Sequence, residues 1–415
     1  MRKLTFIALF LGCAGAQRET RSTPVLAPVA APAQVSVAPV APPEAPPKVE
    51  EPKAAVASTS FADGVTAFEA GQLDDAKAKF EAVPEGDPHR AAARYDLGVV
   101  AERQGDLAAA ESHYREALAL RPDYARALAA VASVLREESK AADALPLYEA
   151  ALRQRPGDLQ LLDGLAAAQR NAGQREQAEA TARRVLARSR DDAEAYRTLA
   201  LCALDAGNPR LAELYALTAR KRAGKDASIA NTLGLIYLKL DQRPRALLEL
   251  QRAATLDPSF APAHLNLGSL ALASRDYATA EKLSSRALAL QPWSKDARLL
   301  RAWALDGLRA QDPHRGPDAG AAFEQVLAFK PDDPEATCGA GFGYGADSAG
   351  YDRALPFLEK CLSLGSTPQE RQAAEGRLKT IQAIQAAAKD KQESEETEAS
   401  GGSGQAEDSP PPPAQ

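Results

Sequence analysis

The chain is poor in the residues that usually build a catalytic or metal site. Its 415 residues include only 4 histidines, 4 cysteines, 2 tryptophans and 1 methionine. The histidines at positions 89, 113, 264 and 314 are far apart, and none has a partner at the spacing of a metal-ligand pair. Acidic pairs such as Asp191-Asp192 and Asp332-Asp333 lie where helices should begin, so capping explains them. We therefore expect a protein that is not an enzyme and that holds no metal or cofactor.

The sequence also lacks a net positive charge and has few long apolar runs. The formal net charge is -6, so we expect no nucleic-acid partner, because phosphate binding needs a concentrated basic surface. The apolar run Leu4 to Leu11 is too short to span a membrane. With only 10 Phe and 10 Tyr in a chain rich in Ala and Leu, the composition favours closely packed helices over sheets.

What the chain does have is a repeated pattern with a step of 34 residues. It is clearest from Ala227 to Pro292, where Leu233-Gly234, Ala246, Ala253 and Pro258 recur as Leu267-Gly268, Ala280, Ala287 and Pro292. Small residues at these positions let two antiparallel helices approach closely, and the proline ends the second helix. One helical hairpin cannot bury its apolar face alone, so successive units must stack.

The pattern resembles the tetratricopeptide repeat, and Pro88, Pro122 and Pro156 keep its step in earlier units. The resemblance implies an all-α fold: a right-handed superhelical solenoid of about nine helix-turn-helix repeats with a C-terminal capping helix. We place the array at 57–366, the capping helix at 367–391 and a disordered acidic, proline-rich tail at 392–415. Leu378, Ile381 and Ile384 are expected to cover the last repeat.

Two irregularities interrupt the step near the C-terminus. Five residues are inserted between Pro292 and Pro331, and Gln311 to Pro317 should form a protruding loop between the helices of unit eight. Several glycines crowd the first helix of unit nine, which we expect to be the weakest helix of the array. Cys338 and Cys361 lie on the two helices of this unit; an oxidising compartment would allow a bridge, and the sequence leaves bridged and free forms open.

The N-terminus is typical of an exported protein. Residues 1–12 combine Arg2 and Lys3 with a short apolar core, as in a lipoprotein signal peptide, and Cys13 would be the lipidated residue. Residues 13–56 form a proline- and alanine-rich linker that would hold the repeats away from the membrane. A competing cut after Ala16 would discard Cys13 and release a soluble protein.

The family resemblance also suggests a binding surface. In tetratricopeptide repeats the first helix of each unit lines the concave face through its second, fifth, ninth and twelfth positions. Units two to five then present Tyr95, Arg126, Arg136, Arg170 and Arg197, and units six to nine present Asn231, Leu235, Leu265, Trp303 and Phe342. We hypothesise an extended segment or helix in this groove, its acidic part near the arginines and its apolar part near Trp303. The alternative is that apolar groove residues such as Leu272 and Leu299 only pack against the next unit.

These features predict a non-catalytic protein-interaction scaffold anchored in the outer membrane through its N-terminal lipid and facing the periplasm. It resembles bacterial tetratricopeptide repeat lipoproteins of envelope machines, which implies envelope proteins or peptides as partners and a role in motility or secretion assembly. No small-molecule substrate is expected. The alternatives are a regulator of peptidoglycan enzymes, a soluble periplasmic or cytoplasmic adaptor, and a secreted enzyme or sugar-binding protein framed by the solenoid.

Overall fold

The computed structural model describes residues 59–364 and 367–401. Within these ranges all regular secondary structure is helical. The predicted signal peptide, Cys13 and the linker to residue 56 lie outside the described residues, as does the tail beyond residue 401. No helix in the described ranges has the length and apolar character needed to cross a bilayer.

The helices of the described chain form nine consecutive pairs, each with a first and a second helix, as the repeat count predicts. The first five pairs are α1 (Thr59–Glu69) and α2 (Leu73–Glu81), α3 (Arg90–Gln104) and α4 (Leu107–Leu120), α5 (Ala125–Glu137) and α6 (Leu145–Gln154), α7 (Leu159–Asn171) and α8 (Arg175–Arg188), and α9 (Ala193–Asp205) and α10 (Pro209–Arg222). The next four are α11 (Ala227–Lys239) and α12 (Arg243–Leu256), α13 (Ala261–Ala273) and α14 (Tyr277–Leu290), α15 (Lys295–Arg309) and α16 (Gly316–Leu327), and α17 (Pro334–Tyr344) and α18 (Tyr351–Ser363).

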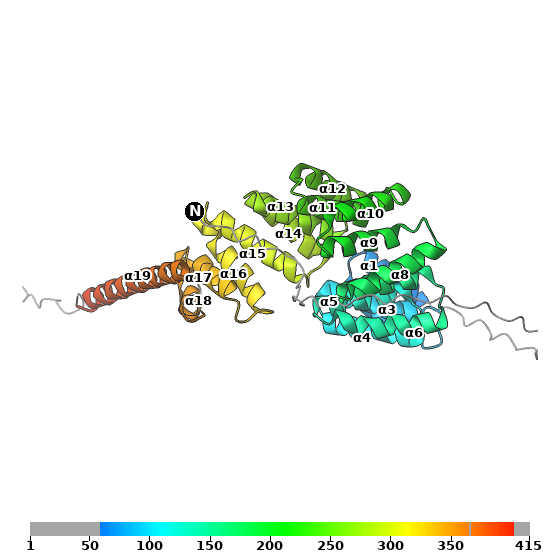
Figure 1. Ribbon diagram of the computed structural model, residues 1–415. Helices are drawn as coiled ribbons and strands as arrows, with labels where there is room; N and C mark the ends of the chain where they lie inside the picture. Colours follow the sequence, from blue (N-terminus) through cyan, green and yellow to red (C-terminus); the bar gives the residue numbers. More distant parts are fainter. Residues whose placement is uncertain (1–58, 365–366, 402–415) are drawn as a thin grey trace, which may run out of the picture.

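Three 3-10 turns precede second helices: η1 (Ala141–Ala144), η2 (Pro313–Arg315) and η3 (Ser348–Gly350). The last helix, α19 (Pro368–Gly401), follows the ninth pair and projects from the end of the array (Figure 1). Capping explains the acidic residues at the starts of helices: Asp192 accepts a hydrogen bond from the Ala195 N–H at 2.9 Å, and Asp333 accepts one from the Ala336 N–H at 2.9 Å. The capping prediction for these two residues is confirmed.

Small residues hold the two helices of a unit close together. A Cβ atom on Gly98 of α3 would lie 2.4 Å from Cε1 of Tyr114, whose ring is buried between α3 and α4. A Cβ atom on Gly234 of α11 would lie 2.6 Å from Leu250 of α12 in the same way. Both distances are shorter than any ordinary carbon contact, so the glycine of the repeat pattern is needed because the facing helix brings a large side chain against it.

The insertion in unit eight differs from the predicted protruding loop. It forms the turn η2, and α16 already begins at Gly316, so Gly316 and Pro317 belong to the helix. A Cβ atom on Gly316 would lie 2.5 Å from the carbonyl oxygen of Gly343, which shows how closely this end of the insertion packs on α17. Residues 311–314 are exposed, and His314 Nδ1 lies 3.1 Å from Asp347 Oδ2. The prolines excluded a continuous helix, but they did not exclude an ordered turn packed on the next unit.

The glycines of α17 are sites of close packing. A Cβ atom on Gly343 would lie 2.4 Å from the backbone nitrogen of Gly320, and one on Gly339 would lie 2.6 Å from the ring of Phe323. Helix α17 therefore meets α16 backbone to backbone. Interior glycines still lower helix propensity, so the expectation that α17 is the weakest helix stays a prediction. The close contacts explain why glycines occupy these positions of α17, which the sequence did not show.

In the C-terminal unit a disulfide joins the two helices, and α19 packs against them. Cys338 of α17 and Cys361 of α18 are bonded, with their Cα atoms 5.0 Å apart. Ile381 of α19 is buried against this unit and Leu378 is half-buried, but Ile384 is exposed, so its predicted covering role is wrong. The helix was expected to end at Lys391 and instead continues to Gly401, so residues 392–401 belong to the helix and not to the predicted tail.

Candidate protein-binding groove

The first helices of the units form the inner side of the array. Successive first helices from α5 to α17 contact one another directly, whereas contacts between successive second helices are sparse. Because elements on the inside of a curve lie closer together than those outside, this pattern places the first helices on the concave face. The curvature brings unit eight back to unit three: Lys295 Nζ, at the start of α15, donates a hydrogen bond to the carbonyl oxygen of Glu137, at the end of α5, at 2.9 Å.

The predicted arginines of units two to five are on first helices, but most are already paired. Arg170 binds Asp205 with two hydrogen bonds, Nε to Oδ2 at 2.7 Å and Nη2 to Oδ1 at 3.1 Å. Arg197 Nε donates to Glu194 Oε2 at 2.7 Å, and Arg136 Nη2 lies 2.8 Å from Glu137 Oε1. These pairs cancel much of the positive charge that the sequence suggested for this part of the groove.

Carboxyl groups are the unexpected feature of this half. Burial, with the charges of Asp192 and Glu194, raises the pKa of Asp163 on α7 to about 8, and its Oδ1 is buried without a hydrogen-bond partner. Burial also raises the pKa of Asp96 to about 6 and that of Glu102 to about 7. All three lie on first helices. Asp163 occupies the fifth position of its unit, the same position as Asn231, so the repeat register could have identified it.

Tyr95 and Arg126 mark the N-terminal end of the groove. The Tyr95 ring packs between two other rings, 5.5 Å from the centroid of Tyr114 and 5.4 Å from that of Tyr124. Burial raises the pKa of Tyr95, so its hydroxyl stays protonated. Arg126 is exposed on α5. This end therefore offers a half-buried aromatic surface beside an exposed guanidinium, a combination that is favoured at protein interfaces.

The second half of the groove is less polar. Asn231 is buried on α11, and its Oδ1 accepts a hydrogen bond from Asn266 Nδ2 of the next unit at 2.8 Å. Leu235 is half-buried against the cluster between α9 and α12, and Leu265 is half-buried on α13. Because the Asn231 side chain already makes one hydrogen bond to the neighbouring repeat, it has fewer hydrogen-bonding groups left to bind a peptide.

Trp303 and Phe342 are anchored in the packing between units. The Trp303 ring lies edge-on to Phe323 with 5.2 Å between centroids, and its Nε1 is buried without a hydrogen-bond partner. Phe342 packs against the cluster of the last unit, and Leu299 packs beside Trp303. These side chains pack in the space between units, as the alternative for residues such as Leu299 describes.

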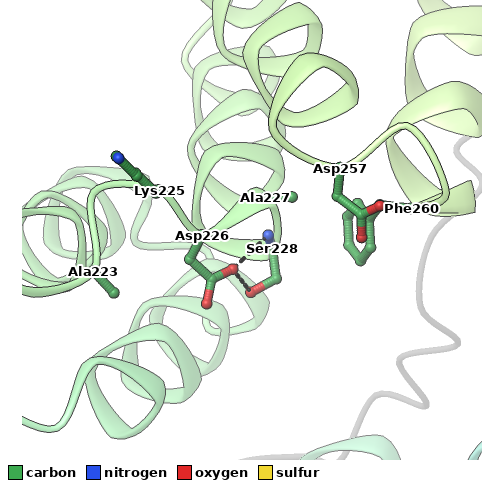
Figure 2. Close-up of a pocket in the computed structure, with 7 residues that line it drawn as sticks. All are labelled: Ala223, Lys225, Asp226, Ala227, Ser228, Asp257 and Phe260. Carbon is green, nitrogen blue, oxygen red and sulfur yellow. Dashed lines mark hydrogen bonds between the residues drawn. The ribbon is translucent and has the colours of Figure 1, made fainter.

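The described surface also has an open depression of about 490 Å³ between units five and seven (Figure 2). Its lining comes from the turns before α11 and α13 and from the first residues of α11: Ala223, Lys225, Asp226, Ala227, Ser228, Asp257 and Phe260. Asp226 Oδ1 accepts from the Ser228 N–H and hydroxyl, both at 2.7 Å, and Asp257 Oδ1 accepts from the Ser259 N–H at 2.8 Å. Both carboxylates therefore stabilise the turns that precede α11 and α13. In the described residues no cluster of His, Cys, Asp or Glu is suited to hold a metal.

Comparison with known families agrees with this arrangement. One tetratricopeptide repeat model matches residues 61–125, 103–159 and 231–297, and a second matches residues 135–202. The matched segments together cover just over half of the chain. The chain belongs to the tetratricopeptide repeat family. Repeats of this family form protein-interaction scaffolds that are typically non-catalytic.

Three solved structures are similar to this chain at low sequence identity. A tetratricopeptide repeat protein from Parabacteroides merdae is 18% identical with a TM-score of 0.45, and the match covers 59% of this chain and 97% of that one. A thermophilic tetratricopeptide repeat protein from Thermus thermophilus is 23% identical with a TM-score of 0.39, covering 44% of this chain and 98% of that one. A chain of the Cut9-Hcn1 hetero-tetramer is 14% identical with a TM-score of 0.47, covering 77% of this chain and 64% of its own length. No curated protein matches the sequence.

In this tetratricopeptide repeat array, the repeat register placed the predicted groove residues on first helices, but it did not show which of them are paired or buried. The predicted residues all lie on first helices, from Tyr95 on α3 to Phe342 on α17. Their role in binding stays a prediction. The ion pairs of Arg170 and Arg197 and the buried oxygen of Asp163 depend on which side chains neighbouring helices bring together, and the 34-residue register alone does not give that.

Proposed function

We propose that this protein is an exported scaffold of the cell envelope, anchored in the outer membrane by a lipid on Cys13, which binds an envelope protein in its concave groove. The role that fits best is assembly of a motility or secretion machine. The observation that carries the proposal is a continuous inner face of first helices on which an exposed arginine, a half-buried tyrosine and half-buried leucines remain available.

The disulfide supports export. Bonds such as Cys338–Cys361 form and persist in oxidising compartments and are rare in the cytosol, where thiols are kept reduced. A periplasm-facing protein is therefore favoured over the cytoplasmic adaptor. Mass spectrometry of the purified protein tests the anchor: a diacylated N-terminal Cys13 is expected, and a mature N-terminus at Gln17 without acyl chains would instead indicate a soluble periplasmic protein.

The partner contacts that we propose are a revised set. Because Arg136, Arg170 and Arg197 are paired with carboxylates, an acidic partner would have to displace those pairs before it could bind there. Arg126, Tyr95 and Leu265 require no such rearrangement. We therefore propose that the partner segment crosses the groove from the Tyr95 and Arg126 end toward Leu265.

Site-specific photo-crosslinking in cells tests this route. A photoreactive residue in place of Arg126 or Leu265 is expected to crosslink the same partner, because one segment would touch both. The same residue in place of Leu120, which is 54% exposed on the second helix α4, is the matched control. Partner capture at Leu120 equal to that at Arg126 and Leu265 would remove the groove as the binding site. The identity of the captured protein separates a motility or secretion component from a peptidoglycan enzyme.

A further inference from the structure

The convex face of units five and six carries an exposed apolar feature that the groove does not use. Leu214 of α10 is 61% exposed and Leu248 of α12 is 67% exposed, and the two are 34 residues apart at the same repeat position. Each lies on the helix side opposite its buried residues, which are Ala212, Ala216 and Ala219 on α10 and Ala246, Leu250 and Ala253 on α12. Both leucines therefore point outward from the array. Leu211 and Leu247 are exposed on the same two helices.

The surroundings of these leucines are basic, although the whole protein has a formal net charge of -6. Helix α10 has four basic residues and one acidic residue, and α12 has three basic residues and one acidic residue. The flanking second helices α8 and α14 also have more basic than acidic residues, whereas α4 and α16 have more acidic than basic ones. The positive charge is therefore concentrated on the convex side of units four to seven.

Ion pairs increase the excess of exposed basic groups on this face, because they hold the acidic side chains of α10 and α12 in largely buried positions. The carboxylates of Glu213 and Glu249 are only 14% and 15% exposed, and each bridges α10 and α12. Glu213 Oε1 lies 3.4 Å from Arg245 Nη1, and Glu249 Oε1 lies 2.6 Å from Arg220 Nη1. Arg210, Arg243 and Arg245 remain exposed around the leucines. Asp241, just before α12, is 93% exposed, and its Oδ1 lies 3.7 Å from Arg243 Nε. A ligand that approaches this face therefore meets leucines, guanidinium groups and the carboxylate of Asp241.

We propose that this leucine and arginine face docks on an anionic phospholipid membrane surface. Charge complementarity supports lipid phosphates as the occupant, because basic residues near an anionic surface are attracted to it and leucines can enter the interfacial layer. A second copy of the chain is disfavoured, since it would place the same arginines against one another. Outward leucines on a convex surface also suit a deformable layer better than a rigid protein, which would need complementary pockets.

The proposal goes beyond the groove function and would orient the array, and it differs from the expectation that the linker holds the repeats away from the membrane. With the convex side of units four to seven on the membrane, the concave groove would face away from the lipid and remain open to a partner. This contact is independent of an N-terminal lipid and would persist without one. Failure of the groove crosslinks would therefore leave it intact, and its own failure would leave the groove proposal intact.

Vesicle co-sedimentation of the full chain tests the membrane contact. Every sample carries Cys13→Ser, so no lipid is attached at that residue and the N-terminal contribution is the same in all samples. Vesicles of phosphatidylcholine alone are compared with vesicles in which about a third of the lipid is phosphatidylglycerol. The expected result is binding to the anionic vesicles that weakens as the salt concentration rises.

Two variants and one control locate the contact. Leu214→Ser with Leu248→Ser, and separately Arg210→Gln with Arg243→Gln, are each expected to weaken binding about tenfold while circular dichroism stays unchanged. Leu120→Ser removes a comparably exposed leucine from α4, where acidic residues outnumber basic ones, and should have no effect. Equal binding to both vesicle types, or variants that bind like the parent, would overturn the proposal.

Two further outcomes would also overturn it in favour of another occupant. A parent chain that sediments as a dimer while the Leu214→Ser and Leu248→Ser chain is a monomer would assign the face to a second copy. A parent chain that ignores vesicles but crosslinks a protein in cells through a photoreactive residue at Leu214 would assign it to a protein partner.

Discussion

The two halves of the groove use the same repeat positions for different purposes. In units two to five these positions carry arginines that nearby carboxylates neutralise, as Asp205 of α9 does for Arg170 of α7. In units six to nine they carry apolar side chains that fill the space between units, as Trp303 does against Phe323. A repeat register therefore shows where a side chain lies but not whether neighbouring helices leave it available. Availability has to be tested separately in each half.

The largest expected effect lies in the C-terminal half, at the disulfide. Replacing Cys338 and Cys361 together by Ala should lower the free energy of unfolding of this unit by about 3 kcal/mol, because the open chain regains conformational entropy. Urea unfolding with and without reductant measures it. Reductant should lower the midpoint of the parent to that of the double variant and leave the variant unchanged. A parent insensitive to reductant would contradict this prediction.

The next effect tests the close backbone packing of the C-terminal units. Gly343→Ala would place a Cβ atom 2.4 Å from the backbone nitrogen of Gly320. Neither backbone can move away cheaply, so we expect a loss of about 2 kcal/mol in unfolding free energy. Gly376→Ala on α19 is the control, since nothing lies within 4 Å of its added Cβ. That change should stabilise the helix by about 0.5–1 kcal/mol, and equal signs for the two variants would contradict the packing argument.

A smaller effect is expected from the charge pairs of the N-terminal half. A double-mutant cycle with Arg170→Ala, Asp205→Ala and the double variant should give a coupling of about 1–2 kcal/mol, because both side chains are largely withdrawn from solvent and share two hydrogen bonds. Urea midpoints of the four chains provide the numbers. Strictly additive single effects would mean that the pair does not act as a unit and that Arg170 is free to bind a partner.

The last effect concerns Asp163 and depends on pH. The pKa of Asp163 in the folded state is raised to about 8, so ionisation of this carboxyl group lowers the free energy of unfolding. The loss begins as the pH rises above the ordinary carboxyl pKa and is complete above the raised pKa. Asp163→Asn removes this cost. We expect a higher Tm than the parent near about pH 9 and nearly the same Tm near about pH 4. Asp191→Asn on an exposed carboxylate serves as the control, and an equal gain at both pH values would contradict the raised pKa.

The sequence by itself determined the repeated unit. Its 34-residue step, its small residues and its prolines predicted nine helix pairs, and the pairs lie in the predicted register, from α1 to α18. This worked because each signal acts within one unit or on its immediate neighbour: a proline ends a helix, and Gly98 admits Tyr114 of the same hairpin. The capping aspartates followed for the same reason, since a cap contacts backbone only a few residues away.

Tertiary structure decided everything that joins residues from separate units. The sequence could not show that Arg170 would find Asp205, that Gly343 would meet the backbone of Gly320, or that Lys295 would reach Glu137 across 158 residues. It also misjudged α19, whose Ile384 is exposed and whose end lies at Gly401. Small rotations between successive units accumulate along a solenoid, so the neighbours of a distant residue depend on the whole curve, while the fold of each hairpin depends only on its own residues.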